Sequence, residues 1–354
     1  MTRPFVSVLI DTYNHEGFIE QALVSVLEQG LSAEEMEVIV VDDGSADNTS
    51  AIVRKFAPRV RYLFKPNGGQ ASAFNVGIPE MHGEIASFLD GDDWWAQDKL
   101  PKALEQLARN PDIGAVGHGY YEVYPNGQRP RAFVLEKPYR LHLGDLATAS
   151  LFSHLRCFLG TSRITIRKGI LDRVLPVPEE LVVEADEFIF TLAVAIGGAL
   201  ILDEPLFYYR LHGGNLFQFG SNDPVKYRRK QTVLVALLRT LPSRLAELGV
   251  APEVVQAVLE PVWVDAERIR LRLDGGWPWD TFRVERAAYR LAYRDADFGY
   301  GLFKAAALAL TALLPPRRFY RFRQWYAEKN LRELRKIIGE PTPAAPVIER
   351  RMEM

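Results

Sequence analysis

The sequence is poor in cysteine and holds no hydrophobic run long enough to span a membrane. Its one cysteine, Cys157, excludes an intrachain disulfide and a multi-cysteine zinc site, as expected for the reducing cytoplasm. The longest apolar stretch, residues 305–314, falls short of the ~20 residues of a spanning helix, and no secretory signal precedes the first strand-like segment. A formal net charge of −2 argues against a protein that coats nucleic acid. We therefore expect a cytoplasmic protein, either free or attached peripherally to the inner face of the cell membrane.

Hydrophobic residues make up 48% of the 354 residues, so the chain can bury a full-sized core. In its first part, short apolar runs alternate with helix-like stretches. The predicted strands are residues 5–10, 36–41, 60–64 and 85–89. The predicted helices are residues 17–29, 50–56, 70–81 and 98–109. This alternation predicts an α/β fold, in which a mostly parallel, Rossmann-like sheet carries helices on both faces.

The pattern changes along the chain. Beyond about residue 225 the sequence is nearly all helical, and turn residues at Asp223-Pro224 separate the two styles. We expect a sheet-containing domain over residues 1–222, a helical C-terminal region over residues 223–340 and a flexible, Pro/Ala-rich tail over residues 341–354.

Polar residues and glycines follow each of the four predicted strands. They are Asp11-Thr12-Tyr13-Asn14, Asp42-Asp43-Gly44, Asn67-Gly68-Gly69 and Asp90-Gly91-Asp92-Asp93. In an open parallel sheet, ligands bind in the crevice outside the carboxyl ends of the strands. The sequence therefore predicts one binding edge to which all four strand ends contribute.

The acidic turn from Asp90 to Asp93 predicts a divalent-cation site. Carboxylates this close repel one another and require a counter-charge, and Mg²⁺ or Mn²⁺ is bound by a few carboxylates together with substrate phosphate oxygens. Gly91 permits a tight turn and the close approach of a ligand. The alternative is a solvated acidic turn that only caps the following helix. The position after the fourth strand favours the cation site.

Two further segments are less specific. Asp42 and Asp43 end a buried strand, where a carboxylate can accept a hydrogen bond from a uracil or ribose group, while Asp47 is expected to cap the next helix. The segment from Asn67 to Gly77 opens a helix, and helix N-termini favour phosphate. Tight packing of that helix on the sheet explains its small residues equally well.

Together these segments resemble the inverting glycosyltransferase family 2, whose catalytic domain has the GT-A fold. The matching stretches are residues 6–14, 41–45, 67–77 and 89–95. They occur in the order and at the spacing of the family. The resemblance is tight over residues 5–100, looser to about residue 216, and says little beyond that.

The resemblance implies a role for each matching residue. Asp11 and Tyr13 would lie against the nucleotide base, although family members often carry a small hydroxyl residue at the position of Asp11, and Thr12 would contact the nucleotide sugar. Asp43 would bind the base, and Asp42 would support the nucleotide pocket. The remaining implied roles are metal ligation by Asp92, contact with the ribose or the metal by Asp90, and nucleotide-sugar contacts by Asn67, Gln70, Asn75 and Gly91.

The family also uses a general base, usually an aspartate ahead of a helix in the second half of the domain. Asp186 fits this position by its distance from Gly197. Glu184 and Glu187 are rivals, because the segment departs from the commoner Glu-Asp pair of the family. The alternative is that these acids merely complement the dipole of the following helix.

The resemblance ends at a segment that contains Arg210 and His212, either of which would neutralise the departing diphosphate. A lone histidine is more often structural than catalytic. Residues 301–325 combine an apolar stretch with interleaved basic and aromatic residues, which suits a helix on a membrane surface. Packing of this segment on the catalytic domain or on a second subunit, in a homo-oligomer, is the alternative.

The implied activity is inverting transfer of a sugar from a nucleoside diphosphate sugar, with UDP as the usual nucleotide and Mn²⁺ or Mg²⁺ as cofactor. The acceptor is a hydroxyl of a glycan, a lipid-linked molecule or another compound, in the synthesis of bacterial cell-surface polysaccharide or glycoconjugate. A sugar nucleotidyltransferase and a catalytically inactive nucleotide-sugar-binding scaffold are the alternatives. No nucleic-acid partner is expected.

Overall fold

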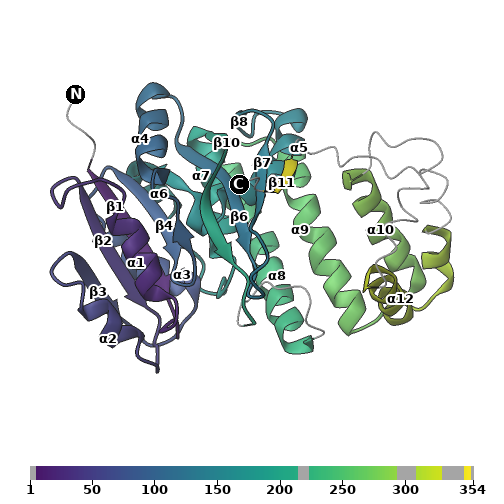
Figure 1. Cartoon of the computed structure of the whole chain (residues 1–354). Helices are drawn as coiled ribbons and strands as arrows, with labels where there is room; N and C mark the ends of the chain where they lie inside the picture. The colour runs from purple at the N-terminus through teal and green to yellow at the C-terminus, as the bar shows by residue number, and fades with distance from the viewer. Residues whose placement is uncertain (1–4, 214–222, 293–307, 329–346, 352–354) are drawn as a thin grey trace. The chain divides into compact units, whose positions relative to one another are not determined.

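The computed structural model describes residues 5–213, 223–292, 308–328 and 347–351 (Figure 1). The chain forms two compact units. The first comprises residues 1–218, 240–255 and 347–354, and the second comprises residues 219–239 and 256–346. Within the described ranges, no helix has both the length and the apolar character needed to cross a membrane.

The first unit begins with four strands that alternate with helices, as the sequence predicts. The strands are β1 (Val6–Thr12), β2 (Met36–Asp42), β3 (Val60–Phe64) and β4 (Ile85–Asp90). The helices are α1 (Ile19–Leu27), α2 (Thr49–Arg54), α3 (Gln70–Gly77) and α4 (Lys99–Arg109). All pairings among these strands are parallel, and their order across the sheet is β4-β1-β2-β3.

The later strands make the sheet mixed. The antiparallel additions are β5 (Trp94–Trp95), β7 (Arg131–Leu135), β8 (Tyr139–Leu141), β9 (Thr165–Arg167) and β11 (Val347–Arg351). β6 (Ala115–Val123) and β10 (Ala199–Arg210) run parallel to each other. The accompanying helices are α5 (Leu146–Leu155), α6 (Lys168–Val174) and α7 (Ala185–Gly197). The expected parallel arrangement therefore holds for the first four strands, and β9 joins them to β6.

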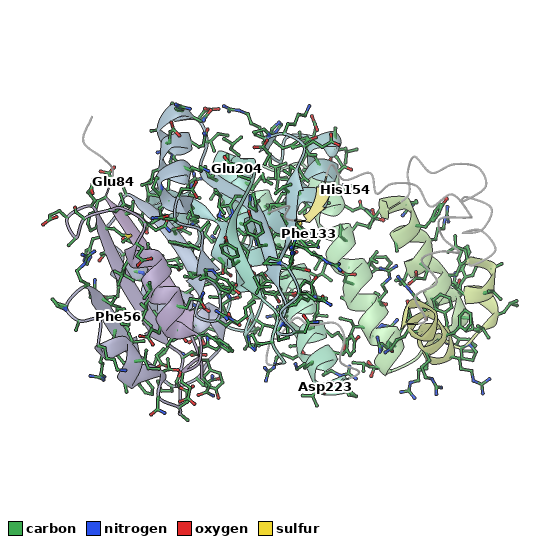
Figure 2. All side chains as sticks on the ribbon, viewed as in Figure 1. Phe56, Glu84, Phe133, His154, Glu204 and Asp223 are labelled. Atoms are coloured by element: carbon green, nitrogen blue, oxygen red, sulfur yellow. The ribbon has the colours of Figure 1, made fainter. Side chains whose placement is uncertain are left out.

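Alternate residues of β1 face two layers of helices. Val8 and Ile10 belong to a core that includes residues of α1 and α4. The α1 residues of this core recur at helical spacing and are Ile19, Ala22, Leu23 and Val26. Leu9 faces α3 instead, where a Cβ on Gly77 would lie 2.0 Å from Leu9 Cδ1. Helices therefore cover both faces of the sheet. Farther along, Phe133 of β7, labelled in Figure 2, stacks on Tyr120 of β6, with ring centroids 5.0 Å apart.

The second unit consists of helices among its described residues. It contains the start of α8 (Pro224–Glu247), most of α9 (Pro252–Leu273), α10 (Pro278–Ala292) and α12 (Pro316–Glu328). Its apolar core joins three helices through residues that include Leu271 of α9, Val284 of α10 and Phe319 of α12. The predicted helical C-terminal region is confirmed.

The end of the chain adds a strand to the first unit. Residues 347–351 form β11, which pairs with β7, within the stretch expected to be a flexible tail. Residues 341–346 and 352–354 of that stretch lie outside the described ranges, as do residues 301–307 of the segment expected at a membrane. The domain limits at residues 222 and 340 remain predictions.

Candidate active site

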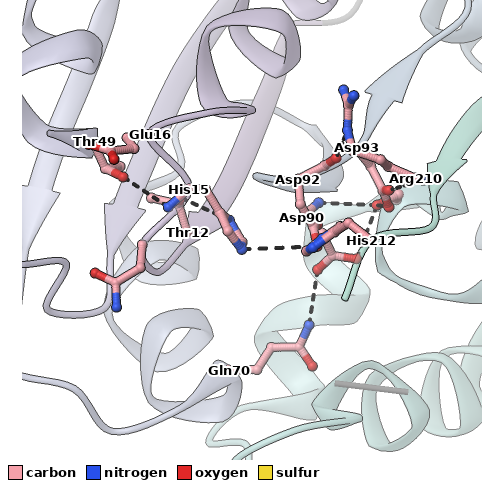
Figure 3. A network of polar contacts seen from close by, with 12 residues as sticks. Thr12, His15, Glu16, Thr49, Gln70, Asp90, Asp92, Asp93, Arg210 and His212 are labelled. Carbon is pink, nitrogen blue, oxygen red and sulfur yellow. Dashed lines mark hydrogen bonds and ion pairs between the residues drawn. The ribbon is translucent and has the colours of Figure 1, made fainter. Parts of the chain in front are cut away.

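The carboxyl ends of β1, β2 and β4 meet at one edge of the sheet, where Figure 3 shows a network of polar contacts. Asp11 of β1 lies beside Asp90 of β4 in the strand register, and Thr12 lies beside Asp42 of β2. The N–H of Asp43 donates to the carbonyl oxygen of Thr12 at 2.9 Å. The strand ends that the sequence predicted to share an edge therefore lie together.

Asp43 organises the loop after β3. Its carboxylate accepts hydrogen bonds from the backbone N–H groups of Gly68 at 2.9 Å and Gly69 at 2.7 Å. The same carboxylate pairs with Lys65, and Asn67 Nδ2 donates to the carbonyl oxygen of Asp43 at 3.0 Å. One buried residue, Asp43, thus bonds to three parts of the loop, so the conformation of the loop after β3 depends on Asp43.

Asp42 is fully buried and supports the neighbouring turn. Its carboxylate accepts the N–H of Ser45 at 2.7 Å and the hydroxyl of Tyr62 at 2.6 Å. Tyr13, at the end of β1, is 47% exposed, so its ring is accessible to a ligand at this edge. Contact of these residues with a nucleotide base stays a prediction.

Gln70, the first residue of α3, links the acidic turn to Thr161 and to the first residue of α7. Its Nε2 donates to Asp90 Oδ1 at 3.2 Å and to Thr161 Oγ1 at 3.1 Å. Its Oε1 accepts the N–H of Ala185 at 3.0 Å. The preceding Gly69 has φ +83°, and a Cβ there would lie 2.5 Å from the carbonyl oxygen of Val182, so the backbone passes too close for a side chain.

Asn75, farther along α3, has structural partners. Its Nδ2 donates to the carbonyl oxygen of Val177 and its Oδ1 accepts the N–H of Val177, both at 2.8 Å. This pair fastens α3 to the loop after α6. The expected nucleotide contact of Asn75 stays a prediction, and it would have to be made by an amide that already bonds the protein.

The acidic turn after β4 is held by Ser162 and Arg210. Ser162 Oγ lies 3.1 Å from Asp90 Oδ2 and 3.2 Å from Asp93 Oδ2. The N–H of Arg210 donates to Asp93 Oδ1 at 2.9 Å, and Arg210 Nε donates to the carbonyl oxygen of Asp92 at 2.9 Å. Both carboxylate oxygens of Asp93 are therefore bonded within the protein.

Asp92 faces two histidines (Figure 3). Its Oδ2 lies 3.0 Å from His212 Nε2 and 3.9 Å from His15 Nε2. Burial alone raises the pKa of Asp92, but the hydrogen bond with His212 and the charges of both histidines lower it overall. Burial lowers the pKa of His15, whose Nδ1 lies 3.2 Å from Thr12 Oγ1. Only glycine fits at position 91, because a Cβ there would lie 2.7 Å from Thr12 Oγ1, too close for a side chain.

Further carboxylates are buried at the same edge. Burial, with the charges of Asp92 and Asp186, raises the pKa of Asp90 to about 7. Burial and the charges of Asp90 and Asp92 raise the pKa of Asp11, whose Oδ1 is buried without a hydrogen-bond partner among the described residues. Buried carboxylates whose ionisation is suppressed by one another's charge are suited to binding a cation or transferring a proton.

The three acids that were candidates for the base differ in their surroundings. Asp186, in the first turn of α7, accepts the N–H of Thr161 at its Oδ2 and the N–H of Glu187 at its Oδ1, each at 2.9 Å. Burial raises the pKa of Asp186. Glu187 forms an ion pair with Arg156, and Glu184 precedes the helix with φ 53°. Through Thr161, Asp186 is connected to the contacts of the acidic turn.

Arg210 and His212 both reach the acidic turn from the end of β10. The guanidinium of Arg210 lies 4.5 Å from the centroid of the Trp94 ring and 4.9 Å from that of Phe18, and its Nη2 donates to Gln21 Oε1 at 2.6 Å. These contacts direct the guanidinium toward α1. The role expected for Arg210 at the departing diphosphate stays a prediction, as does that of His212.

Sequence reasoning missed four residues of the network, namely His15, Thr161, Ser162 and Arg163. His15 carries a usable signal, since it follows the polar end of β1 directly. The other three lie in a short 3-10 turn before β9, which has no periodicity to reveal it. The Arg163 guanidinium lies 4.7 Å from the centroid of the Tyr120 ring, and its charge opposes the burial that raises the pKa of Asp186.

No group of three or more His, Cys, Asp or Glu side chains in the described ranges is arranged as a complete metal site. Asp92 Oδ2 and His212 Nε2 nonetheless converge, 3.0 Å apart, beside the buried Asp90. Mg²⁺ and Mn²⁺ commonly take several ligands from substrate phosphates and water, so a few protein donors suffice. The residues present therefore fit a divalent cation held jointly with a diphosphate.

Residues 7–171, from β1 into α6, match the family described as "Glycosyl transferase family 2". The chain carries a family 2 glycosyltransferase domain. The predicted family is thereby confirmed, and the matched region contains every strand end of the polar edge except that of β10.

Curated relatives of this chain agree with the family. The chain is 32% identical over 216 residues to the uncharacterized glycosyltransferase alr2836 of Nostoc sp. strain PCC 7120, a match that covers 59% of this chain and 66% of the relative. It is 29% identical over 225 residues to the uncharacterized glycosyltransferase EpsJ of Bacillus subtilis, covering 60% of this chain and 63% of EpsJ. The chain thus spans a little under two thirds of the length of these relatives.

Solved structures confirm the expected GT-A fold. Residues 1–349 of TarS from S. aureus, in complex with UDP-GlcNAc, align with a TM-score of 0.57 at 21% identity, over 81% of this chain and 82% of that chain. The mannosyltransferase PcManGT from Pyrobaculum calidifontis, in complex with GDP-Man and Mn²⁺, aligns with a TM-score of 0.50 at 22% identity, over 94% and 88% of the two chains. At these identities the likeness concerns the fold.

Proposed function

We propose that this glycosyltransferase moves a sugar from a UDP-linked donor to an acceptor hydroxyl, with inversion at the anomeric carbon. The observation that carries the proposal is the set of contacts through Gln70, which bonds Asp90 of the acidic turn and Thr161, while Thr161 bonds Asp186. One residue thus couples the diphosphate end of the edge to the candidate base. The UDP-GlcNAc and GDP-Man complexes of the two solved neighbours support a nucleotide-sugar donor.

Asp186 accepts the proton in this mechanism. Two backbone N–H groups orient its carboxylate, and its raised pKa makes it a stronger base than an exposed aspartate. As the acceptor oxygen forms a bond to the anomeric carbon, its proton passes to Asp186. The bond from that carbon to the diphosphate breaks, and the bonding electron pair leaves with the nucleotide. A single displacement inverts the anomeric centre, in contrast to the double displacement of retaining glycosidases.

Asp92 and His212 would hold Mn²⁺ or Mg²⁺, with Asp90 beside them. When bound, the cation stabilises negative charge on the departing diphosphate as a Lewis acid. The Mn²⁺ in the PcManGT complex supports this cofactor. Asp43 keeps the loop after β3 in place for the nucleotide, and Tyr13 offers an exposed ring to its base.

The wider setting is part of the proposal. The acceptor is a glycan, a lipid-linked molecule or another hydroxyl compound, and the product belongs to bacterial surface polysaccharide or glycoconjugate. The cytoplasmic location, the contact of residues 301–325 with a membrane and a homo-oligomeric state stay predictions.

Release of nucleoside diphosphate from a panel of nucleotide sugars, with Mn²⁺ or after chelation, tests the proposal. Asp186→Asn is expected to keep donor binding and lose transfer, whereas Asp92→Ala is expected to lose the metal-dependent part of donor binding and transfer. Asp98→Asn, an exposed acid paired with Lys102, is the matched control and is expected to behave as the wild type. Unchanged turnover in Asp186→Asn would assign the base to another residue.

The same assay separates the two alternatives. A sugar nucleotidyltransferase forms pyrophosphate rather than nucleoside diphosphate, and a scaffold binds the donor without releasing either. Binding is followed through the melting temperature, since a ligand at a hundredfold its Kd stabilises the folded state by about 2.7 kcal/mol.

A further inference from the structure

The second unit exposes large apolar side chains at one pair of turns. Trp277 is 79% exposed and Trp279 is 61% exposed, both where α9 gives way to α10. Leu313, before the Pro315-Pro316 turn that leads into α12, is 75% exposed. Two exposed tryptophans on one turn are unusual for a surface that meets only water. The aromatic pair Phe319 and Tyr320 of α12, in contrast, is buried in the core of the unit.

These two turns lie against each other. Arg317, at the start of α12, donates from Nε at 3.1 Å and from Nη2 at 2.7 Å to the carbonyl oxygen of Leu273, the last residue of α9. A Cβ on Gly275 would lie 3.6 Å from Arg317 Nε. The segment that follows α9 and the start of α12 are therefore neighbours. We name the exposed residues of this region the tryptophan tip. It consists of Trp277, Trp279, Leu313, Arg317, Arg318 and Arg321.

Charge is divided between the two units far more unevenly than the net charge of −2 suggests. Residues 219–239 and 256–346, the second unit, contain 21 Lys and Arg against 12 Asp and Glu, a formal charge of +9. The remaining residues contain 22 Lys and Arg against 33 Asp and Glu, a formal charge of −11. The exposed arginines 318 and 321 extend this positive charge onto the tryptophan tip. A partner of the tip is therefore expected to be anionic.

We propose that the tryptophan tip docks onto an anionic phospholipid surface. Tryptophan is enriched at membrane–water interfaces, where its ring lies at the level of the headgroups, and arginines beside it attract anionic lipid. The exposed aliphatic side chain of Leu313 favours lipid over nucleic acid, which offers bases for stacking but no hydrocarbon. None of the tip residues belongs to the candidate active site, so the proposal holds or fails independently of the activity proposed above.

Cosedimentation of the full chain with vesicles tests the proposal. Wild type is expected to bind phosphatidylcholine–phosphatidylglycerol vesicles and not pure phosphatidylcholine vesicles. The double substitution Trp277→Ala with Trp279→Ala is expected to lower the partition coefficient at least about tenfold, because two large apolar side chains no longer enter the interface. Arg318→Gln and Arg321→Gln are expected to lower it about fivefold each, and added salt reduces binding in the same sense.

The controls remove similar groups from the first unit. Leu146→Ala takes away a 55% exposed leucine, and Arg140→Gln removes the same charge from an arginine paired with Asp112. Both are expected to bind vesicles as the wild type does, and melting temperatures verify that every variant is folded. Equal binding by the double tryptophan variant, or no wild-type binding to anionic vesicles, overturns the proposal. Binding to a single-stranded oligonucleotide that displaces vesicles and depends on the arginines alone overturns it in favour of nucleic acid.

Discussion

The substitution Asp43→Asn distinguishes a carboxylate that holds the loop after β3 from one that only contacts a nucleotide base. In the structure, the carboxylate oxygens of Asp43 accept hydrogen bonds from the N–H groups of Gly68 and Gly69, at 2.9 Å and 2.7 Å, and pair with Lys65. Asparagine keeps one acceptor oxygen, but it turns an NH₂ group toward a second N–H donor and leaves the largely buried Lys65 without a counter-charge. A hydrogen bond to a charged group contributes about 1.5–3 kcal/mol.

We therefore expect Asp43→Asn to lower the free energy of unfolding by about 2–4 kcal/mol, even without nucleotide. For a unit of this size, that corresponds to a fall in Tm of about 4–16 °C, measured by circular dichroism on the nucleotide-free protein. Asp98→Asn serves as the control, because its exposed pair with Lys102 contributes about 0–1 kcal/mol. A nucleotide-free Tm equal to that of the wild type, together with weaker UDP binding, would refute the reasoning and assign Asp43 to the base alone.

Three further substitutions test the packing around the site. Burial lowers the pKa of Lys99 well below its usual value, so the folded state binds fewer protons than the unfolded chain and the free energy of unfolding rises with pH up to the unfolded pKa. Lys99→Met is expected to flatten that rise, measured by urea titrations at several pH values. Parallel curves of stability against pH for the two proteins would contradict this. Gly77→Ala, whose Cβ would lie 2.0 Å from Leu9 Cδ1, is expected to lower the free energy of unfolding by about 1–3 kcal/mol. Gly169→Ala, with open space around it, is the control and is expected to be neutral or stabilising. Equal melting temperatures of the two variants would show that the core adapts. Asn75→Ala is expected to lower the free energy of unfolding by about 2–4 kcal/mol, through the two lost bonds with Val177, and to leave the UDP affinity of the folded protein unchanged. Weaker UDP binding with unchanged stability would place Asn75 at the nucleotide.

Much of the first unit follows from local pattern. Apolar runs such as Val38 to Val41 predict buried strands, and the bounds of β2 and β3 agree with the prediction to within one residue. The helix expected over residues 70–81 ends earlier, at Gly77, and continues as a 3-10 turn that contains Pro79, because proline cannot supply the next helical N–H. The antiparallel strands β5 and β8 have only two and three residues, and a run of that length carries too little periodicity to be recognised.

The site likewise has residues whose place the sequence predicts and residues whose place it does not. Asp11, Asp43 and Asp92 follow strands whose order and direction the sequence implies, so their convergence on one edge was predictable. Ser162 and Arg163 reach that edge from a turn more than 60 residues beyond the acidic turn, and nothing in their own neighbourhood signals it. His212 carried an expected role from the resemblance, but its 3.0 Å approach to Asp92 emerges only when β10 is placed in the sheet.

The amino-acid sequence by itself determined the family, the strand–helix alternation and the edge at which the acids collect, because each depends on residue types at fixed spacing within a local segment. The tertiary structure alone decided which atoms of those residues are already engaged, since hydrogen bonds and burial depend on segments distant in sequence. It shows that Asp43 bonds the loop after β3, that Asn75 bonds Val177 and that Asp92 faces two histidines. It also placed Arg317 of α12 against the carbonyl oxygen of Leu273 at the end of α9, a proximity set by packing of α9 against α12 that no periodicity encodes.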